Sequence, residues 1–413
     1  METYTPADES HASQLRLLLE ELCCDLCRFE HIAADGLLPE NIHIAREYHL
    51  GAPGVFADIR VAPGDLPPYF VEIKFGYSTE AVLKHLRRKY KNEAAVSPHG
   101  SKIILVIDAE NRPEWPNAEA ELRKHLPPGL ELQVWDGRRL LGMLRERFGV
   151  EVEAITAENL LDVRQTIDQA KGFHAFGGDS LAEYEHDPLK AALSWHFGFW
   201  RLRQLREPLQ KTPGEILPPG TYRGVVVLFC DLCCFSSYVR DTPDNEIIRE
   251  SLTSFYSKAR YQIINSGGML YQFVGDEVIA FYGIPDRRED AVRAALATAR
   301  ALVSIGNSVS NHWQRRIDRV QTSGGVHLGM SIGDLQIVSL QPFSRRHVGA
   351  IGDCINVAAR LMAVAGSSEI AVTNSLYEAV DDETQALFRE VEPVEARNVG
   401  RIKAWKLNLE SVP

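Results

Sequence analysis

The stretch VVVLFCDLCCFSSY, residues 225–238, decides the fold of the C-terminal half of the chain. It opens with five apolar residues, which predict a buried strand, and then passes through Cys230-Asp231 into a turn and a helix. Asp231 therefore stands at the C-terminal edge of a buried strand, beside the free amides of the following turn. A carboxylate in this place suits a metal ion with phosphate beside it, although an isolated Asp more often only caps the next helix.

A second stretch, SGGMLYQFVGDEVIAFYG (266–283), predicts a hairpin with a tight Gly275-Asp276 turn at its tip. Asp276 follows Asp231 by 45 positions (276 − 231 = 45), with a predicted helix between them. A strand, helix, strand path can bring both carboxylates to one edge of a sheet. Two carboxylates together with a triphosphate are the ligands that Mg²⁺ or Mn²⁺ prefers.

A third stretch, HVGAIGDCINVAARLMAVA (347–365), places Asn356 and Arg360 four residues apart on a predicted helix, hence on one face. The Asn356 amide can hold a ribose oxygen, and the Arg360 guanidinium can meet a phosphate. Each alone is typical of an ordinary surface residue.

These three segments, in this order, resemble the class III adenylate and guanylate cyclases over roughly residues 222–408. The resemblance implies a ferredoxin-like βαββαβ core, in an α/β (α+β) protein, and an enzyme that uses two divalent metal ions. It assigns the metal ions to two aspartates and a backbone carbonyl, and phosphate to the turn that follows: Asp231, Asp276, Leu232, Phe235 and Ser236.

The same resemblance gives Asn356 the task of orienting the ribose and Arg360 that of stabilising the pentavalent phosphorane. A phosphate-binding lysine of the family corresponds loosely to Arg401 or Lys403 in RNVGRIKAWKL. Family members form head-to-tail homodimers whose sites lie in the interface. Asp231 and Asp276 of one chain are therefore expected to act with the Asn356 and Arg360 side chains of the other.

Two positions of the family read the base, and both depart from its purine patterns here. Adenylate cyclases usually place Lys and then Asp or Thr at these positions, and guanylate cyclases Glu and Cys, whereas this chain has Gln272 and Gly349. Gln272 can donate and accept hydrogen bonds, which suits a pyrimidine edge, and the neighbouring Tyr271 and Phe273 can narrow the pocket. The alternative is that Gln272 still reads adenine.

A cyclase domain behind an N-terminal α/β domain, with departures at both base-reading positions, resembles the bacterial pyrimidine cyclases of antiphage signalling systems. That likeness implies a cytoplasmic lyase that makes cyclic UMP, or cyclic CMP, with Mn²⁺ favoured over Mg²⁺ and UTP over CTP. The product would activate a separate effector protein. An adenylate cyclase making cyclic AMP is the alternative, and a catalytically inactive regulatory module is disfavoured because Asp231, Asp276, Asn356 and Arg360 are all present.

A chain of 413 residues exceeds what one core usually serves, so two domains are expected. We predict an α/β unit at 1–155, a helical connector and Pro-rich linker at 156–220, and the cyclase domain at 221–413. The net charge of −11 argues against broad attraction to nucleic acid or anionic lipid. No apolar run is long enough for a membrane helix, and the acidic start does not resemble a signal peptide.

Within the first predicted unit, GVFADIRVAPGDLPPYFVEIKFG (54–76) reads as two strands joined by a Gly and Pro turn. Asp58 on one strand and Glu72 and Lys74 on the next resemble the PD-(D/E)xK nuclease signature. Alternation puts Glu72 and Lys74 on one face, as that chemistry requires. Cross-strand ion pairing gives the same pattern, however, so we favour a sensor or scaffold on a nuclease-like fold over an active nuclease.

Overall fold

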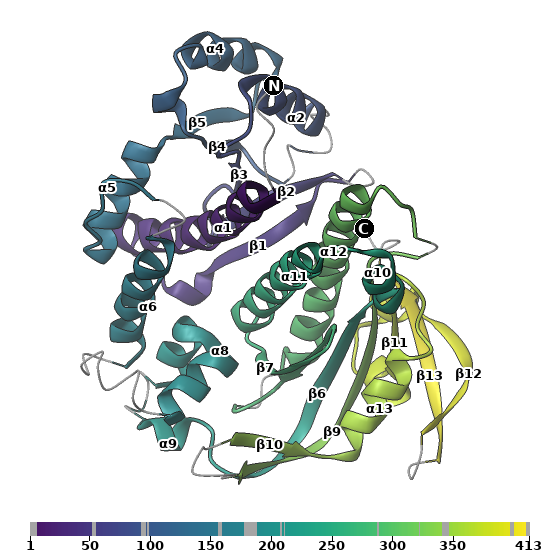
Figure 1. Cartoon of the computed structure of the whole chain (residues 1–413). Coiled ribbons are helices and arrows are strands. Elements are labelled where there is room, and N and C mark those ends of the chain that lie inside the picture. The colour runs from purple at the N-terminus through teal and green to yellow at the C-terminus, as the bar shows by residue number, and fades with distance from the viewer. Residues whose placement is uncertain are drawn as a thin grey trace. The chain divides into compact units, whose positions relative to one another are not determined.

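The computed structural model divides the chain into two compact units, Met1–Lys171 and Gly172–Pro413 (Figure 1). It describes residues 6–51, 55–91, 96, 99–155, 159–176, 188–206, 209, 211–286, 289–321, 323–340, 347–396 and 400–409. In this described part of the chain, no helix combines the length and the apolar content that crossing a membrane requires.

The first unit is built on a five-stranded sheet of order β1-β2-β3-β4-β5. The first three strands form an antiparallel meander, as 54–76 predicts for its two strands, and β3, β4 and β5 run parallel. The elements are α1 (Pro6–Asp35), a 3₁₀ turn (Pro39–Asn41), β1 (Ile42–His49), β2 (Phe56–Pro63), β3 (Tyr69–Ile73), α2 (Thr79–Tyr90), β4 (Lys102–Val106), a 3₁₀ turn (Ala109–Asn111), α4 (Trp115–His125), β5 (Glu131–Trp135), α5 (Gly137–Phe148) and α6 (Leu160–Phe176), which crosses into the second unit.

The second unit is built on an eight-stranded sheet of order β12-β13-β11-β9-β6-β8-β7, with β10 paired to β9 (Figure 1). Its strands are β6 (Gly220–Leu232), β7 (Met269–Val274), β8 (Glu277–Tyr282), β9 (Val326–Leu340), β10 (His347–Ile351), β11 (Glu369–Thr373), β12 (Arg389–Ala396) and β13 (Gly400–Asn408). Its helices are α8 (Pro188–Arg206), α9 (Pro213–Ile216), α10 (Phe235–Asp241), α11 (Asn245–Asn265), α12 (Ala291–Ile317), α13 (Asp353–Met362), α14 (Asn374–Tyr377) and α15 (Asp382–Gln385).

The chain order β6, α11, β7, β8, α12, β9 and the strand order β9-β6-β8-β7 are those of a βαββαβ core. β6 lies between β8 and β9 and is antiparallel to both. Its apolar run is continuous because both faces of a central strand are covered. The mixed α and β composition of the whole chain agrees with the predicted fold class.

Alternate residues of β6 belong to different cores. Val226 and Leu228 pack with α11 and α12, whereas Val227 and Phe229 pack on the opposite face with α13 and part of α8. Strand alternation continues past the apolar run, so Asp231 faces the same side as Val227 and Phe229. The sheet therefore presents its first candidate carboxylate on the α13 face.

Gly329 allows α13 to lie directly against β9. A Cβ atom at this position would meet backbone atoms of the helix, 2.2 Å from the Ala358 carbonyl oxygen and 2.3 Å from the Met362 nitrogen. Neither atom can move without the helix moving. The position of α13, which carries Asn356 and Arg360, therefore depends on a glycine in the facing strand.

We expect Gly329→Ala to displace α13 and to lower the free energy of unfolding by about 2 kcal/mol or more, the usual result of overpacking against backbone. Thermal unfolding followed by circular dichroism measures the effect. Gly214→Ala is the matched control, because a Cβ there meets nothing within 4 Å. Equal melting temperatures for the two variants would contradict this account of the contact.

Candidate active site

Asp231 and Asp276 meet at one end of the central strands. The β6–β8 ladder ends at Cys230 opposite Val278, so Asp231 is the first residue beyond it, next to the hairpin tip. The tip is a tight turn in which Gly275 has φ of 62°, a conformation that favours glycine. Burial and the adjacent Asp231 carboxylate raise the pKa of Asp276 to about 7.

The carboxylate pair has the properties of a cation site. Asp231 Oδ1 is buried and has no hydrogen-bond partner among the residues that the structure describes, while Asp231 Oδ2 lies 3.4 Å from His327 Nε2. An unpaired buried carboxylate oxygen is unfavourable unless a cation meets it. A divalent cation thus fits Asp231 and Asp276.

The protein alone supplies few further ligands. Within the residues that the structure describes, no three His, Cys, Asp or Glu side chains are grouped to hold a metal ion. The backbone carbonyl of Leu232, the residue after Asp231, remains the predicted further ligand, and the Leu232 side chain is buried in the core. The remaining coordination would come from water or substrate oxygens, as is usual for small hard cations.

Two further titratable side chains border the pair, and the sequence analysis assigned no role to either. His327 lies directly opposite Asp231 on β9, and hydrogen bonds to Asp231 and Cys233 raise its pKa to about 10. Burial, and to a smaller extent the negative charge of Asp231, raises the pKa of Glu277. Only the β6–β9 register reveals His327, because it follows Asp231 by 96 positions in sequence (327 − 231 = 96).

Phe235 and Ser236 begin α10 immediately after the Asp231 loop. Cys234 precedes them with φ of 61°, and its carbonyl accepts the amides of Ser237 and Tyr238. Amides in the first turn of a helix have no acceptor within that helix, so those of Phe235 and Ser236 suit an anion beside the metal position. The Phe235 ring is held edge-on to Trp313, with centroids 6.0 Å apart.

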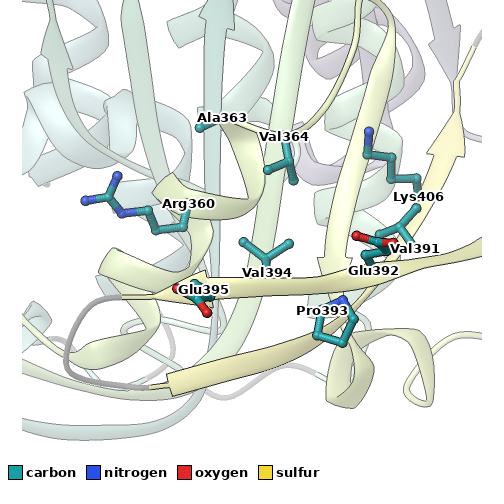
Figure 2. A pocket seen from close by; sticks show the side chains of 9 residues that line it. All are labelled: Arg360, Ala363, Val364, Val391, Glu392, Pro393, Val394, Glu395 and Lys406. Carbon is teal, nitrogen blue, oxygen red and sulfur yellow. The ribbon is translucent and has the colours of Figure 1, made fainter.

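Asn356 and Arg360 are exposed on α13. Arg360 borders a cavity of about 510 Å³ between α13, β12 and β13, and Lys406 lies on its far side (Figure 2). Asp231 and Asp276 are not among the residues that line this cavity, which are Arg360, Ala363, Val364, Val391, Glu392, Pro393, Val394, Glu395 and Lys406. Within one chain, therefore, the cavity beside Arg360 does not include the carboxylate pair.

Arg401 and Lys403 lie on β13 but do not line that cavity. Lys403 Nζ is 3.4 Å from Glu390 Oε1 and 4.9 Å from the centre of the Trp405 ring. Alternation along β13 puts Arg401 and Lys403 on the face opposite Lys406. Lys406, which the sequence analysis did not single out, is the cation of this strand in the cavity, 3.3 Å from Glu369 Oε2.

Gln272 lies on β7 opposite Ile279, a residue of the core on the α13 face, so Gln272 faces that side as well. Tyr271 packs against the same core, with its ring stacked on Phe281 at 4.8 Å. The expectation that Phe273 also narrows this pocket is wrong. Its ring packs in the core on the other face, stacked on Tyr256 at 4.1 Å.

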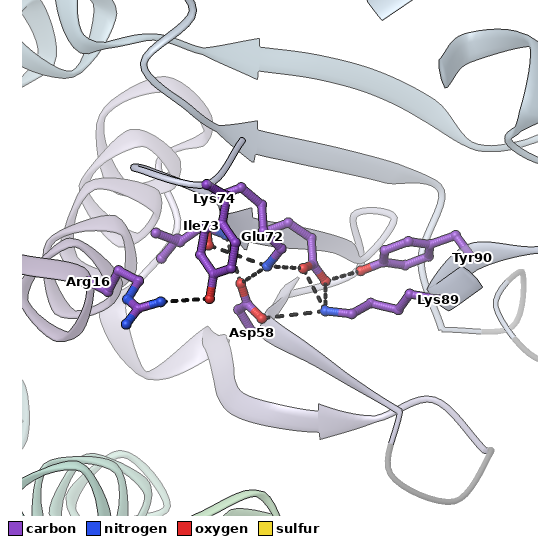
Figure 3. A network of polar contacts seen from close by, with 8 residues as sticks. Arg16, Asp58, Glu72, Ile73, Lys74, Lys89 and Tyr90 are labelled. Atoms are coloured by element: carbon purple, nitrogen blue, oxygen red, sulfur yellow. Dashed lines mark hydrogen bonds and ion pairs between the residues drawn. The ribbon is translucent and has the colours of Figure 1, made fainter. Parts of the chain in front are cut away.

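In the first unit, the structure brings Asp58, Glu72 and Lys74 together (Figure 3). Lys74 Nζ lies 2.6 Å from Asp58 Oδ2 and 2.8 Å from Glu72 Oε2. A second ammonium, that of Lys89, lies 2.6 Å from Glu72 Oε2 and 3.4 Å from Asp58 Oδ1. Two ammonium groups thus balance two carboxylates, and Tyr90 donates a further hydrogen bond of 2.5 Å to Glu72.

This balance differs from the one at Asp231 and Asp276. Burial alone would raise the pKa of Asp58, but Lys74 and Lys89 lower it well below its usual range. The pKa of Asp276, which lies beside another carboxylate, is instead raised. Of the two acidic pairs that the sequence analysis singled out, only Asp231 and Asp276 have a buried oxygen without a partner in the described part of the chain.

We expect Asp276→Asn to stabilise the metal-free protein above pH 7 and to have no effect near pH 4. The raised pKa means that ionising Asp276 opposes folding progressively between about pH 4, its unfolded value, and about pH 7, and that the full penalty persists above pH 7. After allowance for solvent screening of a half-buried group, the gain should be roughly 1–2 kcal/mol.

Melting temperatures at pH 4, 6 and 8 in a chelator measure this difference, with the exposed Glu392→Gln as control. Saturating Mn²⁺ should reverse the order, because only the wild-type pair gains stability from the cation. If Asp276→Asn raised the melting temperature by the same amount at pH 4 and at pH 8, the Asp231 and Asp276 carboxylates would not repel one another.

Comparisons with known proteins agree on the C-terminal part of the chain. Residues 217–409 match the family model described as the adenylate and guanylate cyclase catalytic domain. A terminal-differentiation specific adenylate cyclase of Dictyostelium discoideum is 27% identical over 161 residues, which are 38% of this chain and 7% of that protein. An uncharacterized protein of Mycobacterium tuberculosis is also 27% identical, over 148 residues, which are 36% of this chain and 24% of that protein.

Among solved structures, the guanylyl cyclase Cya2 is 20% identical with a TM-score of 0.40, and the match covers 46% of this chain and 93% of that one. The adenylyl cyclase CyaB from P. aeruginosa is 19% identical with a TM-score of 0.38, covering 45% and 94%. The chain spans less than a third of the curated relatives named above. On the family match, residues 217–409 form a catalytic domain of the class III adenylate and guanylate cyclase family.

Proposed function

We propose that the chain is a nucleotide cyclase that converts a pyrimidine nucleoside triphosphate, UTP in preference to CTP, to the 3′,5′-cyclic monophosphate and pyrophosphate. The observation that carries the proposal is the carboxylate pair Asp231 and Asp276, with its unpaired buried oxygen, inside a cyclase catalytic domain. The unpaired carboxylate oxygen calls for a cation. The substrate of a cyclase domain, a metal-bound nucleoside triphosphate, would place a cation there.

Each residue of the site has a separate task in this reaction. Asp231 and Asp276, with the Leu232 carbonyl, would hold two divalent ions, Mn²⁺ favoured, which when bound acidify the ribose 3′-hydroxyl and neutralise phosphate charge. The amides of Phe235 and Ser236 bind phosphate oxygens. These contacts orient the triphosphate so that the 3′-oxygen can attack the α-phosphorus in line as pyrophosphate leaves.

Asn356 and Arg360 act on the ribose and on the reacting phosphorus. The Asn356 amide holds a ribose oxygen in the orientation needed for ring closure. Arg360 pairs with negative charge that grows only in the transition state, so its loss should lower turnover more than substrate binding. Arg401 or Lys403 is retained as the proposed phosphate contact, although each lies outside the cavity beside Arg360.

We propose that the working site forms between two copies of the chain. Arg360 lines a cavity from which Asp231 and Asp276 are absent, and Asn356 and Arg360 are exposed on α13. A head-to-tail pair in which the aspartates of one copy face α13 of the other would join the two groups, and twofold symmetry would produce two such sites.

The pyrimidine preference rests on Gln272 and Gly349. The Gln272 amide lies on the α13 face and can both donate to and accept from a base edge. Gly349 offers no side chain at the second base-reading position. The alternative is adenylate cyclase activity, with Gln272 reading adenine and cyclic AMP as the product.

A cyclic pyrimidine nucleotide is proposed to be a second messenger for antiphage defence in the cytoplasm, where it would activate a separate effector protein. The departures at both base-reading positions support this assignment. The first unit is proposed to be a sensor or scaffold, because Asp58, Glu72, Lys74 and Lys89 neutralise one another. Nuclease activity would require one ammonium group to leave a carboxylate.

Purified protein incubated with ATP, GTP, CTP and UTP in Mn²⁺ tests the proposal, with products identified by mass spectrometry. We expect cyclic UMP as the main product, at least a hundredfold less with Asp231→Ala or Arg360→Ala, since each removes a group that meets the reacting phosphates. Gly214→Ala, at an open surface position, should keep full activity. Cyclic AMP as the main product would establish the adenylate cyclase alternative.

A further inference from the structure

A β-bulge in β7 determines which side chains reach the α13 face beside Gln272. In the β7–β8 register, Leu270 lies opposite Ala280 and Gln272 lies opposite Ile279. Tyr271 is therefore the extra residue, with no residue of β8 directly opposite it in the ladder. Gln272 shares its face with Ile279, and the Tyr271 ring stacks on Phe281 in the same core. The extra residue thus places two consecutive side chains, Tyr271 and Gln272, on one side of the sheet.

The Tyr271 hydroxyl joins β7 to the strand that carries the second base-reading position. Its oxygen accepts a hydrogen bond of 3.3 Å from the Ala350 amide on β10, one residue after Gly349. Gly349 itself contributes no side chain, and the Tyr271 hydroxyl lies at the amide that directly follows it. The hydroxyl still has its own proton to donate, and a pyrimidine carbonyl oxygen is a suitable acceptor.

The backbone next to the bulge is also held by a contact from helix α8. The buried ring of His196 makes a hydrogen bond of 2.7 Å through Nδ1 to the Leu270 carbonyl oxygen. Stacking on Phe281 and the bond to Ala350 hold the Tyr271 ring itself, and the His196 contact holds the backbone of the preceding residue, Leu270. A ring held in this way can exclude a bulky ligand, whereas a mobile one would move aside.

We propose that Tyr271 is a specificity-determining residue, which limits the base pocket to a single ring and donates a hydrogen bond to a pyrimidine carbonyl. The inference rests on the proposed cyclase function and on Gln272 as a base contact. A purine needs room for a second ring next to Gly349, where the phenol lies. One extra methylene in a hydrophobic pocket already separates substrates by about 10- to 200-fold, so a second ring should be disfavoured at least tenfold.

The test is kcat/KM for all four triphosphates with wild type, Tyr271→Leu and Tyr271→Phe. We expect Tyr271→Leu to raise the purine-to-pyrimidine ratio at least tenfold, by admitting the second ring. Tyr271→Phe keeps the ring and removes the donor, so purines should stay excluded while pyrimidine turnover falls about 5- to 50-fold. Phe273→Leu is the matched control, because its ring lies on the opposite face, and should leave the ratio unchanged.

The outcomes separate this inference from the proposed function. Cyclic UMP from the wild type with an unchanged ratio in Tyr271→Leu would overturn the role of Tyr271 and leave the cyclase assignment standing. Cyclic AMP from the wild type would overturn both the base assignment and the exclusion by Tyr271. If Tyr271→Leu does not fold, Tyr271→Phe decides, since unchanged pyrimidine turnover would refute the donor. If turnover is slow, the rise in melting temperature with each triphosphate supplies the same ranking.

Discussion

Burial of β6 on both of its faces is the constraint on which the second unit depends. Where β6 is covered by α11 and α12 on one side and by α13 on the other, it has to be apolar, as Val225–Phe229 is. After this apolar run, the end of the strand is the first place where a charged side chain is tolerated, and Asp231 stands there. Alternation then fixes the face to which its carboxylate points, and the antiparallel partners β8 and β9 bring Asp276 and His327 to the same end.

The two acidic pairs in the chain show how the same residue types acquire different chemistry. In the first unit, Lys74 and Lys89 reach both carboxylates, so that pair is internally neutral and forms a stable ion-pair cluster. At Asp231 and Asp276 the only nearby cationic group is His327, among the described contacts, and one carboxylate oxygen remains without a partner. The two pairs differ in the number of cationic side chains that the fold places beside them. The second pair has fewer, which makes it suited to bind a metal ion.

Much of the second unit could be predicted from sequence because its signals are local. The apolar run before Asp231, the Gly-Asp turn and the i, i+4 spacing of Asn356 and Arg360 each specify one element. Which side chains meet across elements depends on register and could not be predicted. His327 lies opposite Asp231 only through the β6–β9 pairing, and the parity of β13 puts Lys406, not Arg401 or Lys403, in the cavity that Arg360 lines. The bulge in β7 likewise separates Tyr271 from Phe273, two residues that a regular strand would place on one face.

Catalysis is proposed to use the aspartates of one copy with the arginine of another, and mixing two inactive variants tests this sharing of the site most directly. Asp231→Ala and Arg360→Ala should each be inactive alone, and an equimolar mixture, co-refolded or co-expressed, should recover about a quarter of wild-type activity. Random pairing makes half of the dimers mixed, and each mixed dimer has one intact site of two. No activity in a mixture that is shown to contain mixed dimers would contradict a site shared between two copies.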